Sequence, residues 1–290
     1  MNIGALIGLV LGVGILGFAA FMGAADQGVA MSKLWDYISL LIVVGGSLAA
    51  TCIAYPLPDV LGSLKGFIKI FKGNDFTMKD IIQDYVNLAE QARKGELSKA
   101  LEETPEHMSF RLGFIKDGLK MITDGYSKDD IRSMLENQEQ YRAIREIKAA
   151  NAMAKLGEYA PSFGMIGTLF GLVFMLGGMA VPPPPGVDPT AKMIGAMAIA
   201  LLTTLYGALF AFFLFNPLAD HMKYINEEKK VESALGLEGT MLLFDKIHPL
   251  MVQDKLNVFL YRKDRLTRYS CRHKSHPNSS TSSVRHSRRR

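Results

Sequence analysis

A stretch of the sequence near residue 200 is apolar enough to lie in a membrane yet carries three hydroxyl groups. It has the sequence AIALLTTLYGALFA (residues 198–211) and contains Thr203, Thr204 and Tyr206 but no charged side chain. A hydroxyl group in hydrocarbon needs a hydrogen-bond partner, because leaving it unpaired costs free energy. Two interpretations are open for the threonines, Thr168 included. Their hydroxyls can bond to the carbonyl one turn back in their own helix, or they can offer oxygen atoms to a partly dehydrated cation.

Four parts of the chain have the length and composition of transmembrane helices. Residues 1–25, 37–58, 159–181 and 193–219 contain no Asp, Glu, Lys or Arg, and these runs lead us to place spans at residues 1–25, 34–55, 159–181 and 193–216. Each is long enough to cross about 30 Å of hydrocarbon as a helix. The first span has no basic region before its apolar part, so we interpret it as a retained span rather than a signal peptide.

The positive charges indicate how these spans are oriented. Of the 33 Lys and Arg residues, 16 lie in residues 56–158 and 15 in residues 217–290. Only Lys33 lies between the first two spans, and only Lys192 between the last two. The positive-inside rule places both basic segments, and both chain termini, in the cytoplasm.

The long segment between the second and third spans, residues 56–158, is predicted to be helical. Its apolar residues recur at helical spacing with charged residues between them. Asp80 and Ser127 are predicted N-caps, and Gly95 is a predicted break between two helices. The chain is thus expected to be an all-α membrane protein with four transmembrane helices, a helical cytoplasmic insert and a cytoplasmic C-terminal tail.

The other segments outside the spans are shorter or simpler in composition. Residues 182–192 form a loop stiffened by four consecutive prolines, and residues 217–261 are predicted to be helical. Residues 262–290 hold ten Lys and Arg against one acid, which is typical of a disordered tail. Cys52 and Cys271 lie in different segments, so no disulfide is expected.

Glycines recur on one helical face in two of the spans. Gly4, Gly8 and Gly12 are four residues apart in the first span, and the third span has Gly164, Gly167 and Gly171. Small residues at such spacing let helix backbones approach closely, so we expect tight helix packing in both places.

Known catalytic patterns are missing from the sequence. It has no Rossmann glycine motif, no phosphate-binding loop and no His/Cys cluster with metal spacing, and its six histidines are scattered. We therefore expect no enzyme activity, no cofactor, no metal site and no nucleic-acid partner. An ion route across a membrane usually needs an ionisable group within it. Since the apolar runs contain none, another chain would have to supply that group.

Two segments resemble a known family. YAPSFGMIGTLFGLVFML at 159–176 and GAMAIALLTTLYGALFAFFLFNPLADHM at 195–222 are similar to the third and fourth spans of flagellar motor stator A subunits. This is the MotA/PomA family, within the wider MotA/TolQ/ExbB proton channel superfamily. The motifs IGLVLG near the N-terminus and LEGTMLLFDKIHP at 237–249 fit the same pattern in order.

The resemblance implies a stator unit in the bacterial inner membrane, in which five A subunits surround two B subunits and contact membrane lipid. The B subunit would bring the ion-binding aspartate, and the passage of Na⁺ or H⁺ would drive torque on the rotor switch protein FliG. This chain would supply the wall of the ion pathway through Thr168, Thr203, Thr204 and Tyr206. A threonine at position 168 resembles the sodium-type stators, which favours sodium, with protons as the alternative.

The resemblance also implies roles for two prolines and a charged segment. Pro161 and Pro217 would couple ion passage to movement of the cytoplasmic part, although a proline can also simply mark a helix boundary. Charges on a predicted hairpin would contact the rotor. Arg93 and Lys94 are alternative bases for this contact, because only one of them has the family's spacing to the acid. The full predicted contact set is Arg93, Lys94, Glu96, Glu102 and Glu103.

Three other classes of protein compete with this interpretation. An ExbB/TolQ-like subunit that powers outer-membrane processes typically has three spans, so the first two runs argue against it. A transporter or channel acting alone would need a charge within its own spans. A purely structural scaffold would not need the threonine cluster.

Overall fold

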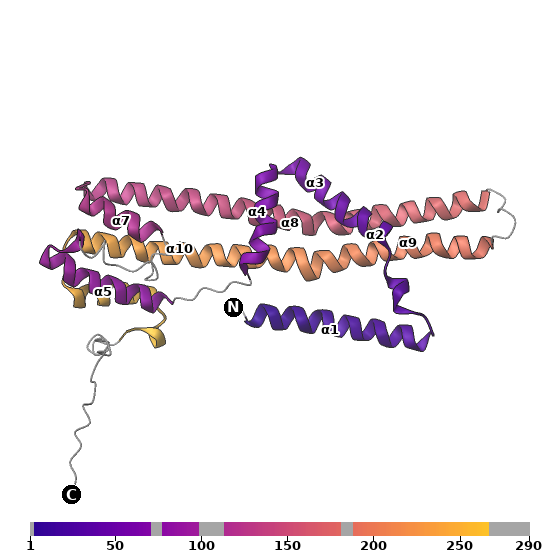
Figure 1. The fold of residues 1–290 in the computed structure, drawn as a ribbon, viewed down its shortest axis with the longest axis horizontal. Helices are drawn as coiled ribbons and strands as arrows, with labels where there is room; N and C mark the ends of the chain where they lie inside the picture. Colours follow the sequence, from indigo (N-terminus) through magenta and orange to yellow (C-terminus); the bar gives the residue numbers. More distant parts are fainter. Residues whose placement is uncertain (1–2, 71–76, 99–112, 181–187, 267–290) are drawn as a thin grey trace, which may run out of the picture. The chain divides into compact units, whose positions relative to one another are not determined.

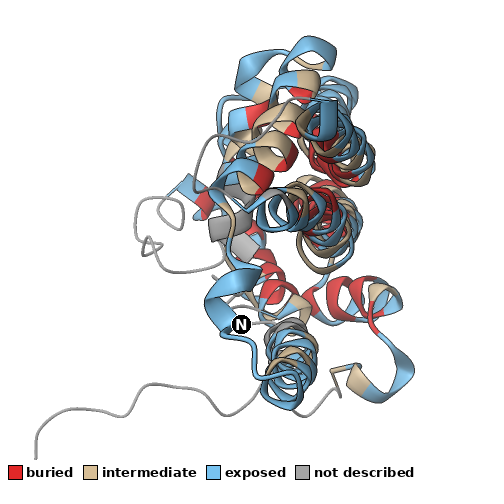
Figure 2. Cartoon of the chain, turned by 90° about the vertical axis from the view of Figure 1, so that its right-hand side faces the viewer, coloured by how far each residue is buried: buried red, intermediate tan, exposed pale blue. Residues whose placement is uncertain are grey.

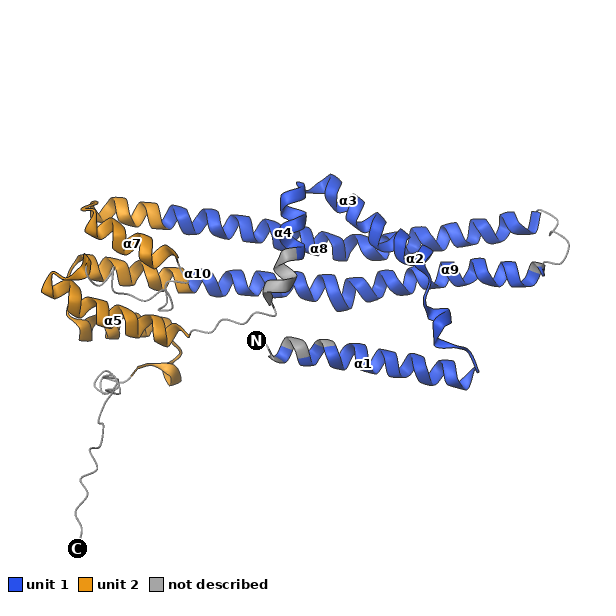
Figure 3. Cartoon of the chain, viewed as in Figure 1, with its two compact units in different colours: residues 1–75, 136–231 blue, residues 76–135, 232–290 orange. Residues whose placement is uncertain are grey.

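The computed structural model describes residues 3–70, 77–98, 113–180 and 188–266, and the regular structure in these residues is entirely helical (Figure 1). The chain divides into two compact units (Figure 3). Unit 1 comprises residues 1–75 and 136–231, and unit 2 comprises residues 76–135 and 232–290. The predicted all-helical class is confirmed for the described residues.

Unit 1 contains the apolar helices of the chain. The boundary with unit 2 falls inside the two longest of its helical elements, α8 and α10. The elements that lie wholly or partly in unit 1 are α1 (Ile3–Asp26), η1 (Met31–Leu34), α2 (Tyr37–Leu40), η2 (Leu41–Gly45), α3 (Gly46–Ala54), α4 (Leu57–Ile70), α8 (Lys128–Ala180), α9 (Pro189–Leu209), η3 (Phe210–Phe215) and α10 (Asn216–Phe244).

Three helical segments among the described residues are long and apolar enough to cross a membrane. They are Met31–Ala54, Lys128–Ala180 and Thr190–Phe244. The first predicted span corresponds to α1, a helix of 24 residues, of which the continuously described part Val10–Asp26 is apolar. Apolar side chains on α1 are largely exposed, including Phe18. Such a surface suits contact with lipid or with another apolar chain.

Helical structure continues past both prolines, so neither marks a helix end. Pro161 lies inside α8, and Pro217 is the second residue of α10. Immediately before Pro217, η3 is a π-helix, and the Asn216 N–H bonds the carbonyl of Ala211. Proline has no N–H to continue the α-helical pattern, and a π turn is one way in which a helix adjusts around such a gap. A second π turn, η2, lies in the segment that was predicted as span two.

Buried side chains from several helices form the core of unit 1. Val43 of η2, Leu156 and Ala160 of α8, and Ala211 and Phe215 of η3 belong to one buried cluster. Figure 2 shows buried positions on helix faces turned towards a neighbouring helix and exposed positions around them. The two π turns therefore contribute side chains to the same packed layer as the helix that carries Pro161.

Unit 2 is built from amphipathic helices around a buried tyrosine. Its own elements are α5 (Met78–Lys94), α7 (Gly113–Thr123), α11 (Pro249–Leu256), η4 (Asn257–Phe259) and η5 (Arg262–Asp264). The Tyr85 hydroxyl donates to the Gly236 carbonyl at 2.7 Å and lies 3.1 Å from the Thr240 hydroxyl. Burial raises the pKa of Tyr85 above its ordinary range, because the charged form would lose its hydration.

The ends of the unit 2 helices only partly match the sequence predictions. The prediction that Asp80 is an N-cap is wrong: the N-cap of α5 is Thr77, and Asp80 at the third helical position bonds back to the Thr77 N–H. The two residues form a capping box, in which the side chain of each accepts a hydrogen bond from the backbone N–H of the other. Both residues are polar and they are three positions apart. Ser127 precedes α8 and accepts from the Asp130 N–H at 3.2 Å, as predicted. Gly95 ends α5 at a φ of 77°, which favours glycine.

Two segment boundaries differ from those predicted. Helix α9 begins at Pro189 and is capped by Asp188, within the predicted loop 182–192. The four consecutive prolines of that predicted loop lie outside the described residues. Towards the C-terminus, the sequence predicts a disordered tail that begins at residue 262. Asp264 instead pairs with Lys79 at 2.9 Å, and residues 267–290 lie outside the described residues.

Candidate functional site

Glycines of α8 bring its backbone against α9 within unit 1. A Cβ atom added at Gly167 would lie 2.5 Å from the Thr203 side chain, and one at Gly171 would lie 2.6 Å from the Ala200 side chain. At Gly164 the nearest atom would be the Thr203 carbonyl oxygen, at 2.9 Å. None of the three positions can accept a larger residue without movement of its neighbours. We call this contact, formed by Gly164, Gly167 and Gly171 with Ala200 and Thr203, the glycine seam.

The similar glycine pattern in α1 is used differently. A Cβ atom at Gly4 or Gly8 would meet nothing within 4 Å, and only Gly12 has a close neighbour, the Phe213 ring of η3. The expected tight packing is thus present for α8 but is limited to Gly12 for α1. The same sequence signal has a packing role in one helix and leaves open space beside the other.

At the edge of the glycine seam, the hydroxyls of Thr168 and Thr204 meet. Their Oγ1 atoms are 2.5 Å apart. The Thr168 hydroxyl also lies 3.1 Å from the carbonyl oxygens of Gly164 and Ala200, and the Thr204 hydroxyl lies 3.5 and 3.4 Å from the same two atoms. Four oxygen atoms from two helices therefore gather in one place.

This group of oxygens has spare accepting capacity. Two hydroxyls hold only two hydrogens between them, so lone pairs stay free on the hydroxyl and carbonyl oxygens. Thr168 is partly exposed and Thr204 is exposed, so the oxygens can be reached from outside the helix pair. Rings of carbonyl and hydroxyl oxygens can replace part of an ion's hydration shell. The arrangement is therefore chemically suited to a passing cation.

The other two hydroxyls predicted for the ion pathway lie elsewhere on α9. Thr203 is fully buried, and its hydroxyl donates to the Ala200 carbonyl of its own helix at 2.9 Å. Tyr206 is also buried, and its hydroxyl bonds backbone groups near the start of α2. Of the four predicted pathway residues, the structure brings together Thr168 and Thr204.

Pro161 and Pro217 lie close to this helix pair. A Cβ atom at Gly207 of α9 would fall 2.6 Å from the Ala160 carbonyl and 3.1 Å from the Cα of Pro161. A Cβ atom at Gly157, one turn before Pro161, would lie 1.9 Å from the side-chain oxygen of Asn216, the neighbour of Pro217. Pro161 thus lies where the backbones of α8 and α9 touch, whereas Pro217 follows a residue whose side chain packs against Gly157 of α8.

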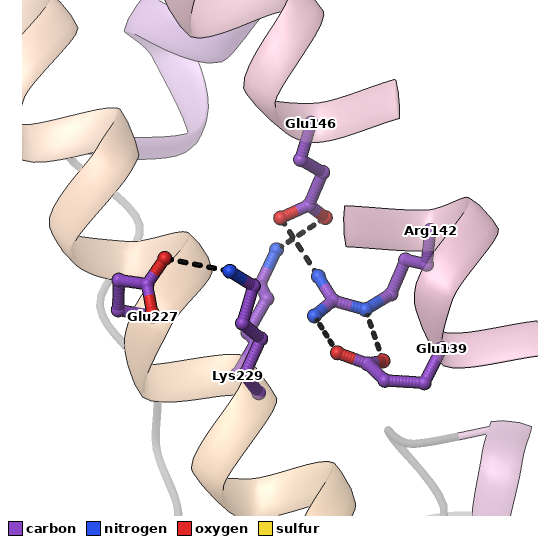
Figure 4. Close-up of polar contacts among 6 residues, drawn as sticks. Glu139, Arg142, Glu146, Glu227 and Lys229 are labelled. Carbon is purple, nitrogen blue, oxygen red and sulfur yellow. Dashed lines mark hydrogen bonds and ion pairs between the residues drawn. The ribbon is translucent and has the colours of Figure 1, made fainter. Parts of the chain in front are cut away.

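A network of charges, which the sequence interpretation did not single out, joins α8 to α10 within unit 1 (Figure 4). Arg142 binds both carboxylate oxygens of Glu139, at 2.7 and 2.5 Å, and pairs with Glu146 at 2.8 Å. Glu146 also pairs with Lys229 of α10 at 2.7 Å. The three α8 residues stand at helical spacings of three and four, a signal visible in the sequence. Lys229 could not be found that way, since its position depends on the fold.

A buried amide lies one turn from the end of this network. Asn226 is fully buried, and neither its side-chain oxygen nor its nitrogen has a hydrogen-bond partner among the described residues. We call Glu139, Arg142, Glu146 and Lys229, together with Asn226, the charged seam. Buried polar groups are rarely left unpaired, so this amide is unusual among the residues that the structure describes.

The residues predicted to contact the rotor lie on unit 2. Arg93 and Lys94 occupy the last turn of α5, and both are exposed, as is Glu96 just after it. A groove of about 430 Å³ beside them is also lined by His248 and Leu250 at the start of α11. The remaining predicted contacts, Glu102 and Glu103, lie outside the described residues.

The part of the chain that the structure describes contains no group of three or more His, Cys, Asp or Glu side chains that could hold a metal ion. Cys52 is a free, exposed thiol, and Cys271 lies outside the described residues.

Comparisons with known proteins connect this geometry to a family. Residues 106–233 match the model of the MotA/TolQ/ExbB proton channel family. The chain is 35% identical to motility protein A of Treponema phagedenis over 257 residues, which cover 87% of this chain and 94% of the relative. It is 33% identical to the chemotaxis protein PomA of Vibrio alginolyticus over 261 residues, which cover 90% and 96%.

Two solved structures have the same fold. The first is MotAB of C. jejuni, with a TM-score of 0.76 and 23% identity, covering 93% of this chain and all of that chain. The second is the flagellar MotAB stator complex of Bacillus subtilis, with a TM-score of 0.71 and 26% identity, covering 87% and 95%.

Proposed function

Since this chain belongs to the MotA/TolQ/ExbB proton channel family, among the proteins called motility protein A, we propose that it is the A subunit of a flagellar motor stator. The chain matches relatives named motility protein A and chemotaxis protein PomA over nearly their whole length. In this role the chain is an ion-channel subunit of the cell membrane that works together with a MotB-type partner.

The observation that carries the mechanism is the pair of threonines at the glycine seam. Thr168 and Thr204 present their hydroxyls beside two backbone carbonyls, on stretches of α8 and α9 without charged side chains. Oxygen atoms of this kind can lower the cost of partial dehydration for a cation, but they cannot hold or release a proton at neutral pH. The carboxylate that the ion visits therefore belongs to the partner chain, whose spans would pack beside this helix pair.

The finer parts of the proposal concern assembly and direction. Five copies surround two B subunits in the inner membrane, with four spans each and both termini in the cytoplasm. The exposed bases Arg93 and Lys94 then meet acidic residues of the rotor protein FliG, where complementary charges steer and orient the contact. Pro161 lies where the backbones of α8 and α9 touch, and the neighbour of Pro217, Asn216, packs its side chain on Gly157, which supports a role for both prolines in passing a local change at the ion site to the cytoplasmic part.

Sodium is the favoured ion, and protons are the alternative. Sodium needs several oxygen ligands in place of its water, and the threonine pair with its two carbonyls supplies four from this chain. A cation releases about 2.3 kcal/mol for each 100 mV of membrane potential that it crosses, so the work of rotation must be collected over many passages.

The test is to restore swimming in a strain that lacks its own stator A subunit, while sodium is varied at fixed pH. Thr168→Ala should abolish swimming or raise the half-saturating sodium concentration about tenfold, the equivalent of about 1.4 kcal/mol of lost ion binding. Thr168→Ser, which keeps the hydroxyl, should retain most of the speed. Ser162→Ala on the same helix is the matched control, because its hydroxyl bonds only the Glu158 carbonyl of its own helix.

A normal sodium response of Thr168→Ala would contradict the assignment of the site. Failure of the unaltered chain to restore swimming with any MotB-type partner would contradict the stator function itself. Swimming that follows pH and ignores sodium would leave the stator function standing and identify the proton as the ion.

A further inference from the structure

The hydroxyl of Tyr206 makes two hydrogen bonds with the backbone just before α2. It donates to the Leu34 carbonyl at 2.5 Å and accepts from the Asp36 N–H at 3.0 Å. These two backbone groups stand on either side of Trp35, in the link between η1 and α2. The Tyr206 side chain is only 8% exposed. We call this pair of hydrogen bonds the Tyr206 clasp.

The same part of the chain also packs against α9 at a second place, beside Ser39. The Asp36 carboxylate caps α2 by accepting from the Ser39 N–H at 2.7 Å and from the Ser39 hydroxyl. Ser39 is fully buried, and its oxygen lies 3.4 Å from the Ile199 carbonyl. Ile199 and Tyr206 are seven residues apart, so they lie on one face of α9 about two turns from each other. The start of α2 therefore touches that face at two heights.

The opposite side of α9 carries the ion-pathway candidate. Thr204 precedes Tyr206 by two residues, which places the two side chains about 200° apart around the helix. Thr204 meets Thr168 of α8, whereas Tyr206 meets the link before α2. Contacts on two sides fix how α9 is turned about its own axis. A small turn of α9 would move the Thr204 oxygen away from Thr168.

We propose that Tyr206 is a positioning residue, whose clasp on Leu34 and Asp36 keeps α9 turned so that Thr204 faces Thr168. This rests on the proposed stator function and reassigns Tyr206, which the sequence places in the wall of the ion pathway. Its hydroxyl has one hydrogen, already donated, and the oxygen accepts the Asp36 N–H, so little capacity is left for an ion. Loss of the hydroxyl would leave the Leu34 carbonyl and the Asp36 N–H without this partner.

Tyr206→Phe tests the proposal, because it removes the hydroxyl and keeps the ring. The variant is made in the complete stator complex, and hydrogen exchange of the segment around Asp36 is measured by mass spectrometry. Loss of the bond should speed exchange of the Asp36 amide about tenfold. Trp35 is the sole tryptophan of the chain, so its emission reports on the same link. Tyr37→Phe is the control, since Tyr37 is a neighbouring tyrosine that is 71% exposed.

Swimming assays separate positioning from ion contact. Tyr206→Phe should lower the maximal speed several-fold while the half-saturating sodium concentration changes less than about twofold. A tenfold shift of that concentration with unchanged exchange at Asp36 would overturn the proposal, because the hydroxyl would then contact the ion. Faster exchange with full speed would also overturn it, since the clasp would hold the link without positioning α9.

A second variant keeps the test decisive if Tyr206→Phe does not assemble. Ser39→Ala loosens the same link from the side of α2 and should give the same pattern of faster exchange and lower maximal speed. An unchanged maximal speed in Ser39→Ala would count against the proposal. The exchange measurement does not depend on motility, so it still reads the clasp in a complex that fails to drive swimming.

Discussion

Two stretches of α8 in unit 1 are held to the returning helices by opposite kinds of contact. The glycine seam brings backbones together and leaves no room for a Cβ atom at Gly167. In the charged seam, long side chains connect the helices through ion pairs between carboxylates and cations (Figure 4). Close backbone approach is an effective contact where no water is present, because burial in lipid-like surroundings gives apolar side chains no hydrophobic advantage.

Where water reaches a contact between helices, charged side chains cost less free energy to place there, and their ion pairs can rearrange. The side chains of Arg142 and Lys229 are 25% and 33% exposed, so their ion pairs are partly screened. A seam of this kind can exchange partners without a change in backbone spacing. The comparison predicts that added side-chain volume destabilises the glycine seam and that loss of a charge destabilises the charged seam.

The largest effect is expected from Gly167→Ala. The new methyl group would lie 2.5 Å from the Thr203 side chain, so the helices must separate. Overpacking of this kind typically costs about 1–3 kcal/mol of folding free energy. Thermal unfolding of the purified complex and swimming speed are the measurements, and both should fall.

Gly177→Ala provides the matched control on the same helix. A Cβ atom at Gly177 meets nothing within 4 Å, and alanine favours a helix over glycine by about 1 kcal/mol. This variant should be neutral or more stable. If both alanine variants behave alike, the glycine seam has no special role.

Arg142→Ala should have the next largest effect. It leaves Glu139 and Glu146 facing each other without the cation between them, which costs about 1–3 kcal/mol for a partly buried group. The loss should shrink in about 1 M salt, where screening acts over about 3 Å. Unfolding measured at low and high salt provides the test.

Lys155→Ala is the comparison for an exposed pair. Lys155 and Glu158 have exposures of 39% and 61%, and such pairs contribute about 0.2–1 kcal/mol at most. Equal losses in the two variants would mean that the charged seam is no more than a set of surface ion pairs.

The smallest effect is expected from Asn226→Leu, and its sign is the informative part. Leucine has the same branched side-chain skeleton as asparagine, with bulkier methyl groups at its ends, and it removes two buried polar atoms that have no partner among the described residues. The variant should unfold at the same or a slightly higher temperature. The expected gain in the free energy of unfolding is at most about 1–2 kcal/mol. A clear loss of stability would show instead that Asn226 is well paired, through water or through a partner chain.

The sequence could predict those features that depend on local composition. Long apolar runs indicate membrane helices, and hydroxyls inside such a run indicate a site that must be satisfied, which led to Thr168 and Thr204. The N-cap Ser127 was also predictable, because its partner is three residues away. In α5 the same logic chose Asp80 over Thr77, although the two residues bond each other in one capping box.

Contacts between distant residues were beyond the reach of the sequence. The partner of Tyr206 is Leu34, which lies 172 residues earlier. Glu146 and Lys229 are 83 residues apart. The helices also continue through Pro161 and past Pro217, because packing on both sides offsets the hydrogen bond that a proline removes. Such compensation depends on the folded neighbours and leaves no local mark in the sequence.

The π turns η2 and η3 are the places where the gene could lose a single codon with the least disturbance of the fold. A π turn accommodates one additional residue in a helix, while the helix on either side of it keeps the same faces towards its neighbours. Loss of a single codon within 41–45 or 210–215 would convert that turn to ordinary α-helix, whereas the same loss elsewhere in the helix would swing every later side chain by about 100°. One-residue length differences among related genes should therefore collect at these two places.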